Sequence, residues 1–379
     1  MSINDKSNSF RKLGAVIVGG FAVVALTTAP LKAIAQETRN HVAEKPQPGR
    51  VAAVDEDGAP ELTERASQAI DKGLKHLLSI QKPDGSWDEG GEGRHDVGIT
   101  SLGLMAFMAQ AHFPGSGPYG KQLDRAKEFL LKKAKAGNDG YIGSVMYEHG
   151  LATLALSEMW GMTRNKEDDD AIQKALEAAV KEILRSQNEG GGWRYQPQVD
   201  AGQDTSVTVM IFVALASARQ AGIVVPNETI KKVLVYLESA WIPDSGAFAY
   251  VPGGQGRKSS GGTVAATAGG AYAAQLAGQR DSEMVAGALR YLEKQSPGIF
   301  GNTEFYYYAH YYAIQAMVQA GDEQYAAWYP KIRDAMIGKQ QPDGSWSKAK
   351  KGEAGGSYQT PMAIIILATP HRYIPIYQR

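Results

Sequence analysis

The feature that most constrains the fold is a period of about fifty residues that runs through most of the chain. Each period holds one amphipathic segment with charges on one side and one segment that is nearly free of charge. The amphipathic segments end near Gln81, Ala134, Gln187, Ala240, Gln295 and Gln341. Successive ends lie 53, 53, 53, 55 and 46 residues apart. A period of this length is typical of architectures built from stacked or ring-closed helical units.

Both kinds of segment have the pattern of an α-helix. In the first amphipathic segment, Ile70, Leu74, Leu77 and Leu78 recur at the spacing of one helical face. The charge-poor segments are apolar all round, which requires burial on every side. They begin near Asp96, Tyr147, Asp204, Gly262, Tyr306 and Ser357. We therefore predict an all-α fold of six helical hairpins, with the charge-poor helices in an inner ring and the amphipathic helices in an outer ring.

Six such units can close into an α/α toroid or continue as an open solenoid, and periodicity alone does not separate these two. The heptapeptide QKPDGSW at residues 81–87 returns as QQPDGSW at residues 340–346. Because the last unit resembles the first and not a polar cap, the repeat favours closure. The turn itself has a structural explanation, since Pro-Asp-Gly favours a tight turn and the tryptophan covers the junction with the next helix.

The first sixty residues differ from the repeats. Basic residues precede an apolar run and the small-residue site Ala33–Ala35, which is the order of a secretory signal. We predict a signal peptide over 1–35, a disordered linker over 36–60 and a toroid domain over 61–379, in a periplasmic or secreted protein with no strong membrane association after cleavage. The alternative is an uncleaved anchor.

Charge and cysteine content exclude several classes of function. The chain has 40 basic and 40 acidic residues, so no excess of positive charge is present to hold a nucleic-acid backbone, and we expect no nucleic-acid partner. It has no cysteine, which excludes disulfides, thiolate metal ligands and cysteine nucleophiles. No cofactor and no metal site are predicted.

The segment KGLKHLLSIQKPDGSW at residues 72–87 resembles the QW repeat of triterpene cyclases and the related repeat of protein prenyltransferase β-subunits, with weaker copies ending at Trp193 and Trp346. The resemblance covers about residues 61–379 and implies a terpenoid cyclase-like α/α toroid around a central cavity, as in exported single-toroid bacterial members. The catalytic motifs are missing. The acidic run at 167–170 has Glu where the Asp-x-Asp-Asp motif of the cyclases begins, and the zinc site of the prenyltransferases needs a cysteine.

Candidate site residues lie at the heads of the inner helices, because a ligand in a toroid meets those heads and the loops before them. The catalytic candidates are Asp96, Glu148, His149, Asp204, Glu304 and His310. The ligand-binding candidates are Arg94, His95, Tyr147, Tyr307, Tyr308, Tyr311 and Tyr358. An Asp and a His that face each other across a cavity would serve as a base and its orienting partner. The structural alternatives are N-caps for Asp96 and Asp204, a hydrogen-bonded core histidine for His149, and core packing for the tyrosines.

Three functions remain open. An aromatic wall suits a hydrophobic or isoprenoid-like ligand in the central cavity, with or without catalysis, and this is the interpretation we prefer. A carbohydrate-active lyase or hydrolase on the same toroid would need a histidine base or two carboxylates. A non-catalytic envelope adaptor would need neither. The expected partner is thus a hydrophobic small molecule or a glycan.

Overall fold

The computed structural model describes residues 60–88, 95–199, 202–253, 262–296, 301, 303–347 and 356–378. All of these residues belong to the same structural unit. The predicted signal peptide and all but the last residue of the predicted linker lie outside them, so both stay predictions. None of the helices in the described ranges is both long and apolar enough to cross a membrane.

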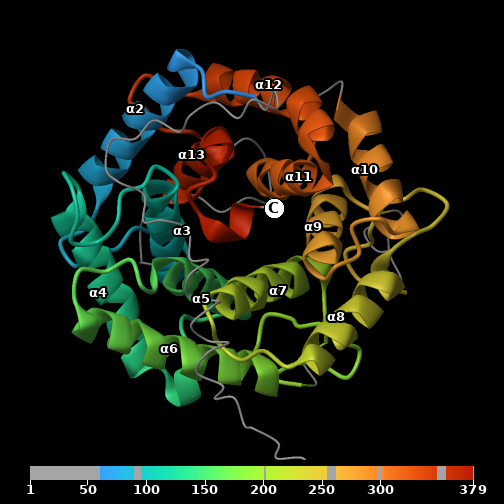
Figure 1. The fold of residues 1–379 in the computed structure, drawn as a ribbon, viewed down its shortest axis with the longest axis horizontal. Helices are drawn as coiled ribbons and strands as arrows, with labels where there is room; N and C mark the ends of the chain where they lie inside the picture. The colour runs from blue at the N-terminus through green and yellow to red at the C-terminus, as the bar shows by residue number, and fades with distance from the viewer. Residues whose placement is uncertain are drawn as a thin grey trace, which may run out of the picture. The chain divides into compact units, whose positions relative to one another are not determined.

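The described residues form twelve α-helices and no strand, arranged in two concentric rings (Figure 1). The outer ring consists of α2 (Glu64–Ile80), α4 (Gly120–Ala136), α6 (Lys166–Arg185), α8 (Asn227–Ala240), α10 (Glu283–Gln295) and α12 (Asp322–Lys339). The inner ring consists of α3 (Asp96–Met108), α5 (Met146–Met159), α7 (Thr205–Gln220), α9 (Val264–Leu276), α11 (Tyr306–Ala320) and α13 (Gln359–Leu367). The predicted α/α toroid of six hairpins is confirmed.

The charge pattern of each helix explains its ring. In α6 the buried side chains include Ile172, Leu176, Val180 and Ile183, which share one face, while the opposite face carries charges. In α13 every residue is buried. A helix with one apolar face needs cover on one side only, whereas a helix that is apolar all round needs it on every side. The two kinds of helix therefore separate into an exposed outer ring and an enclosed inner ring.

The ring closes between the last unit and the first. Gln340 Nε2 donates a hydrogen bond of 2.7 Å to the backbone oxygen of Ala69, 271 positions away in sequence. Helix α13 packs against both α2 and α3. A Cβ atom on Gly73 would lie 2.8 Å from the ring of Trp346, so this glycine permits the close approach. The closed toroid is thus observed, and the open solenoid is excluded.

The repeated turn joins the two rings. The indole of Trp87 donates to the backbone oxygen of Leu77 at 2.7 Å, and the Trp87 backbone N–H donates to Thr100 Oγ1 at 3.0 Å. The same two bonds recur at Trp193 and at Trp346. Each tryptophan thereby links the end of an outer helix to the first turns of the next inner helix. The turn has the structural role that its sequence indicates.

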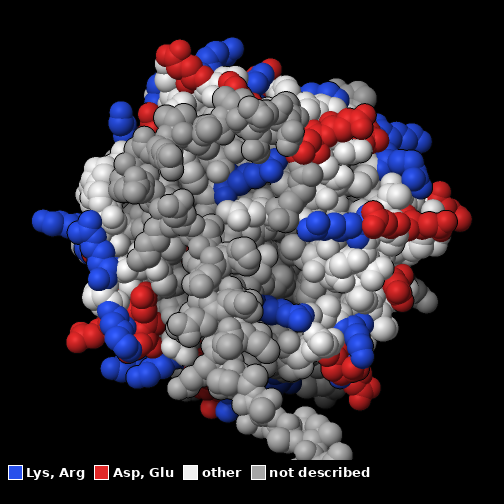
Figure 2. All heavy atoms as spheres, viewed as in Figure 1, with Lys and Arg blue, Asp and Glu red and all other residues white. Residues whose placement is uncertain are grey.

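Figure 2 shows one face of the ring, where acidic and basic side chains of the described residues are interspersed around the rim. The overall balance of 40 basic and 40 acidic residues is thus also a local mixture on this face. Charges of alternating sign produce no strong field of one sign over such a surface. The described charges on this face therefore indicate no ligand of one particular sign.

Candidate functional site

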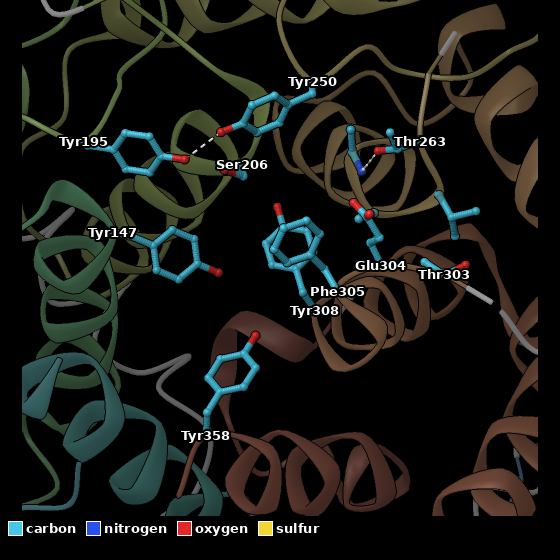
Figure 3. A pocket seen from close by; sticks show the side chains of 13 residues that line it. Tyr147, Tyr195, Ser206, Tyr250, Thr263, Thr303, Glu304, Phe305, Tyr308 and Tyr358 are labelled. Carbon is cyan, nitrogen blue, oxygen red and sulfur yellow. Dashed lines mark hydrogen bonds between the residues drawn. The ribbon is translucent and has the colours of Figure 1, made fainter. Parts of the chain in front are cut away.

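A cavity of about 620 Å³ opens at the N-terminal turns of α5, α7, α9 and α11, which we call the pocket end of the inner ring. Each of these helices, and the 3₁₀ turn η3 (Gly356–Tyr358) before α13, contributes lining residues (Figure 3). The inner helices enter the pocket end from loops, and at least one side chain from the first turn of each of these four helices lines the shared space. A cavity therefore lies at the inner-helix heads, where the candidate ligand-binding residues were predicted.

Six aromatic rings form most of the wall. They are Tyr147, Tyr195, Tyr250, Phe305, Tyr308 and Tyr358. The rings of Tyr147 and Tyr308 lie 6.5 Å apart between centroids. Figure 3 shows the hydroxyls of Tyr147 and Tyr358 directed toward the open centre of the cavity. The wall thus presents ring faces and edges together with phenol oxygens.

The apolar side of the cavity comes from the first turn of α9. Val264, Ala265 and Ala266 line it, and their small side chains leave room between α9 and α11. Thr263 caps this helix, because its Oγ1 accepts the backbone N–H of Ala266 at 3.1 Å. This cap satisfies one of the free backbone N–H groups at the start of α9. The side chains of Val264, Ala265 and Ala266 give this part of the lining its apolar character.

A group of hydroxyls forms the polar side of the cavity. The hydroxyls of Tyr195 and Tyr250 are 2.6 Å apart, and Ser206 lies beside them (Figure 3). Burial raises the pKa of Tyr147, Tyr250 and Tyr308 above the ordinary value of a phenol, so these hydroxyls stay protonated at neutral pH. They can donate and accept hydrogen bonds but supply no charge.

Glu304 is the one carboxylate among the described lining residues, and it is exposed. No described lining residue is basic. The described lining therefore combines an aromatic wall, an apolar side, a group of hydroxyls and a single acid. Across the described ranges no group of three His, Asp or Glu side chains is arranged to hold a metal ion.

Four of the predicted residues meet in this cavity: Tyr147, Tyr308, Tyr358 and Glu304. Arg94 lies outside the described residues. Tyr307 and Tyr311 point elsewhere: the Tyr307 hydroxyl donates to the backbone oxygen of Ser347 at 3.2 Å, and Tyr311 contacts the C-terminal residues. The aromatic run of α11 therefore divides between the cavity wall and the core.

The carboxylates of Asp96 in α3 and Glu148 in α5 bind neighbouring side chains and backbone groups outside the cavity. Asp96 Oδ2 lies 2.7 Å from Lys133 Nζ of α4. Glu148 accepts bonds from the backbone N–H and hydroxyl of Ser144, and its other oxygen is 3.3 Å from His95 Nδ1. Asp96 is not the N-cap that its position suggested, because His95 takes that place in a left-handed conformation, with φ of 56°. None of Asp96, Glu148 and His95 lines the cavity.

The two candidate histidines are enclosed in the core. His149 Nδ1 accepts the backbone N–H of Ile142 at 3.0 Å, and its Nε2 bonds the backbone oxygen of Ala179 at 3.1 Å. Burial lowers the pKa of His149 to about 4, so the ring is neutral at pH 7. His310 packs edge-on against Tyr306, with 4.5 Å between centroids. The hypothesis of a His149–Asp96 pair finds no support, since each group is engaged with other partners.

Asp204 lies directly behind the polar side of the cavity. Its Oδ1 accepts from the backbone N–H of Val207 and from the hydroxyl of Ser206, at 3.0 and 2.7 Å, so it caps α7 as predicted. Burial raises the pKa of this carboxyl. Its Oδ2 accepts no hydrogen bond from the residues that the structure describes and lies 3.9 Å from Arg194 Nε. Asp204 thus acts on the cavity through Ser206, which does line it.

Sequence reasoning missed several lining residues. Tyr195 and Tyr250 are 55 positions apart, one repeat period, and each follows by two residues the aromatic that ends its turn, Trp193 or Phe248. An alignment of the repeat units would have placed both at the same site. Ser206 and Phe305 carry no comparable signal, because a serine and a phenylalanine at a helix start are ordinary.

No protein-family model and no curated protein sequence matches the chain. Solved structures do match its fold. The unsaturated glucuronyl hydrolase of Bacillus sp. GL1 is 12% identical with a TM-score of 0.60, over 84% of this chain and 99% of that chain. The α-1,6-mannanase of Salegentibacter sp. HEL1_6 is 9% identical with a TM-score of 0.59, over 81% and 99%.

A type II terpene cyclase from Scytonema, in complex with geranylgeranyl dihydroxybenzoate, is 15% identical with a TM-score of 0.54, over 82% of this chain and 98% of that chain. At these identities the matches establish architecture alone. The chain therefore has the α/α toroid fold that terpene cyclases share with carbohydrate-active enzymes.

Proposed function

We propose that this protein is exported and that its cavity binds a hydrophobic, isoprenoid-like ligand. The observation that carries the proposal is the wall of six aromatic rings around about 620 Å³, closed on one side by Val264, Ala265 and Ala266. A cavity of this size accommodates a molecule of several hundred daltons. Each Å² of apolar ligand surface buried there contributes roughly 25 cal/mol.

The polar side of the cavity orients the ligand. Tyr195, Tyr250 and Ser206 provide hydroxyls at one side, while the first turn of α9 provides none at the other. A ligand with one hydroxyl or carbonyl at the end of an apolar body satisfies both sides at once. Such a division of a pocket into an apolar body and a few placed polar groups is the usual basis of small-molecule selectivity.

A glycan is the alternative ligand, and two observations bear on it. The tyrosine rings and hydroxyls would also suit sugar rings, and the α/α toroid supports carbohydrate chemistry in other proteins. Hydrolysis of a glycoside, however, generally uses two carboxylates about 5–10 Å apart. Among the described residues the cavity holds only Glu304. The geometry therefore favours binding of an apolar body over hydrolysis of a sugar.

The test combines native mass spectrometry of protein purified from the export compartment with thermal shifts in a ligand panel. Geranylgeraniol and squalene represent apolar ligands, and mannotriose and cellobiose represent glycans. We expect a co-purified apolar molecule, a higher Tm with geranylgeraniol, and a mature mass that shows cleavage near residue 35. Binding of the sugars alone would establish the alternative, and binding of neither class would leave the adaptor function.

Two substitutions locate the binding. Phe305→Ala and Tyr308→Ala each remove a ring from the wall, and we expect each to weaken geranylgeraniol binding by about tenfold or more, since a buried aromatic contact contributes one to several kcal/mol. Tyr291→Ala is the matched control, because Tyr291 is a partly buried tyrosine on the outer helix α10. Equal losses for all three variants would place the ligand outside the cavity.

A further inference from the structure

The opposite end of the inner ring is filled by the chain's own C-terminal tail, residues 374–378. Figure 1 shows this red segment inside the inner ring. Ile374, Ile376 and Tyr377 are buried, with 2%, 0% and 3% of their surface exposed. We call this end, formed by the C-terminal halves of α5, α7, α9 and α11, the tail end. The buried side chains of the tail fill the space between these helices.

Several inner helices hold the tail by hydrogen bonds. Tyr272 of α9 donates to the backbone oxygen of Ile376 at 2.8 Å, and Tyr311 of α11 shares a bond of 2.8 Å with the Tyr377 hydroxyl. Gln319, also on α11, donates to the backbone oxygen of Gln378 at 2.8 Å. Most of these contacts are made by side chains and not by a backbone ladder. These bonds do not belong to the internal hydrogen bonds of the helices, which are complete without the tail.

A buried carboxylate lies among these contacts. Glu158 is in the last turn of α5 and is 6% exposed, and its Oε1 accepts from the hydroxyl of Ser217 of α7 at 2.5 Å. Besides Ser217, the backbone of Ile376 in the tail is the hydrogen-bonding group that faces this carboxyl. The other groups that face it are three phenols, Tyr272, Tyr311 and Tyr377, which belong to α9, α11 and the tail. No described Lys, Arg or His compensates its charge.

The protonation state of Glu158 therefore matters for the tail. Burial raises its pKa to about 7, against the opposing effects of the Ser217 hydroxyl and the backbone of Ile376. When the tail leaves, water reaches this carboxyl and the pKa returns toward the ordinary value of 4.5. The state with the tail bound consequently holds one more proton than the released state at pH values between about 4.5 and 7.

A column of tyrosines connects the two ends. Centroids are separated by 4.7 Å between Tyr308 and Tyr312, 4.8 Å between Tyr312 and Tyr311, and 6.1 Å between Tyr311 and Tyr377. Tyr308 also lines the cavity. These rings form a continuous packed column, so the tail is in indirect contact with Tyr308 in the cavity wall.

We propose that the tail end is a peptide site that binds residues 374–378 of the same chain reversibly, and that protonation of Glu158 favours the bound tail. The tail end lies outside the lining of the cavity, so binding of the tail does not depend on which ligand the cavity holds.

The experiment is hydrogen exchange of the full-length protein between pH 5 and pH 8.5, read by mass spectrometry and corrected for the chemical exchange rate at each pH. The reporters are the backbone N–H groups of Tyr377 and Gln378, which bond Ile374 and Pro375 in the docked tail. We expect their protection to fall about tenfold per pH unit from pH 5 to pH 7 and to level off above pH 7. Amides of α6 report global unfolding in the same samples.

Three variants test the assignment. Glu158→Gln should make tail protection independent of pH, whereas Glu177→Gln, which removes an exposed carboxylate of α6, should leave the wild-type dependence. Tyr377→Phe removes the bond to Tyr311 and should lower tail protection at every pH while the slope persists, which keeps the test valid if Glu158→Gln does not fold. An unchanged slope in Glu158→Gln would overturn the role of Glu158. Tail amides that exchange only together with α6 would overturn reversible binding.

Discussion

The two ends of helix α5 carry buried titratable groups of opposite kind. His149 is in the first turn, at the pocket end, and Glu158 is in the last turn, at the tail end. Burial lowers the pKa of His149 to about 4 and raises that of Glu158 to about 7, so both are neutral between these values. Burial therefore keeps both of these side chains uncharged over the same pH range, although one is a base and the other an acid.

The two ends differ in how they are completed. At the pocket end Asp204 and Thr263 cap α7 and α9, and a cavity lies between the starts of the inner helices. At the tail end the chain's own last residues occupy the corresponding space. The pocket end thus has space for a ligand, whereas residues 374–378 of the same chain fill the tail end. The following substitutions test this difference, from the largest expected effect to the smallest.

Truncating apolar side chains should affect the sealed end far more. Ile376→Ala should lower the free energy of unfolding by about 2–5 kcal/mol, because the side chain is fully enclosed and its removal leaves a void. Val264→Ala, at the rim of the cavity, should lower it by less than about 1 kcal/mol. Urea unfolding of both variants measures the difference. Equal losses would mean that the tail is not packed as a core element.

The pocket end should weaken in acid through His149. Its pKa is lowered in the fold, so the stabilisation it brings is complete above about pH 6.5 and is lost as the pH falls toward 4, by on the order of 3 kcal/mol. His149→Gln keeps a donor and an acceptor for Ala179 and Ile142 and should remove this part of the slope. Thermal unfolding from pH 7 to pH 4.5 compares the variants, with His76→Gln on α2 as control. An acid slope equal to wild type in His149→Gln would exclude this origin.

Loss of one hydroxyl at the tail end should cost stability. Tyr311→Phe leaves the enclosed Tyr377 hydroxyl without its partner at 2.8 Å, and we expect a loss of about 1–3 kcal/mol. Chemical unfolding at pH 6 provides the measurement. The loss should shrink in the double variant with Tyr377→Phe, where no orphaned hydroxyl remains. Additive losses would contradict a direct bond between the two tyrosines.

The equivalent change at the pocket end should have the smallest effect on stability. Tyr195→Phe also breaks a hydroxyl pair, with Tyr250, but Tyr195 is 43% exposed, so water can replace it. We expect a change of less than about 0.5 kcal/mol in unfolding and a clear loss of affinity for geranylgeraniol relative to squalene. A loss of stability as large as that of Tyr311→Phe would show that the pair is structural.

The ring was predictable from sequence because it depends on patterns that many residues share. The charge distribution of each helix determines which ring it joins, and the period of about fifty residues determines how the units follow one another. Closure was predicted from the repeat of one turn, and the Gln340–Ala69 bond joins the second copy of that turn to α2. Such signals are redundant, so single ambiguous residues do not obscure them.

The site was predictable only in part because it depends on the direction of individual side chains. Three consecutive residues of α5 illustrate this: Tyr147 faces the cavity, Glu148 packs against Gly98 of α3, and His149 bonds Ala179 of α6. Successive residues of a helix point about 100° apart. Sequence placed all three at a helix head, but the rotation of α5 against its neighbours decides which one a ligand meets.

The seam between the two ends of the chain has a consequence for biosynthesis. Helix α2, the first of the described helices, receives its inner neighbour α13 and the Gln340 bond only from residues made almost 300 positions later. Contacts of such sequence separation form late, because a very long loop must close before they bring any stabilisation. The nascent protein must therefore carry an uncovered apolar face through most of its translation, and the last unit to be made completes the first.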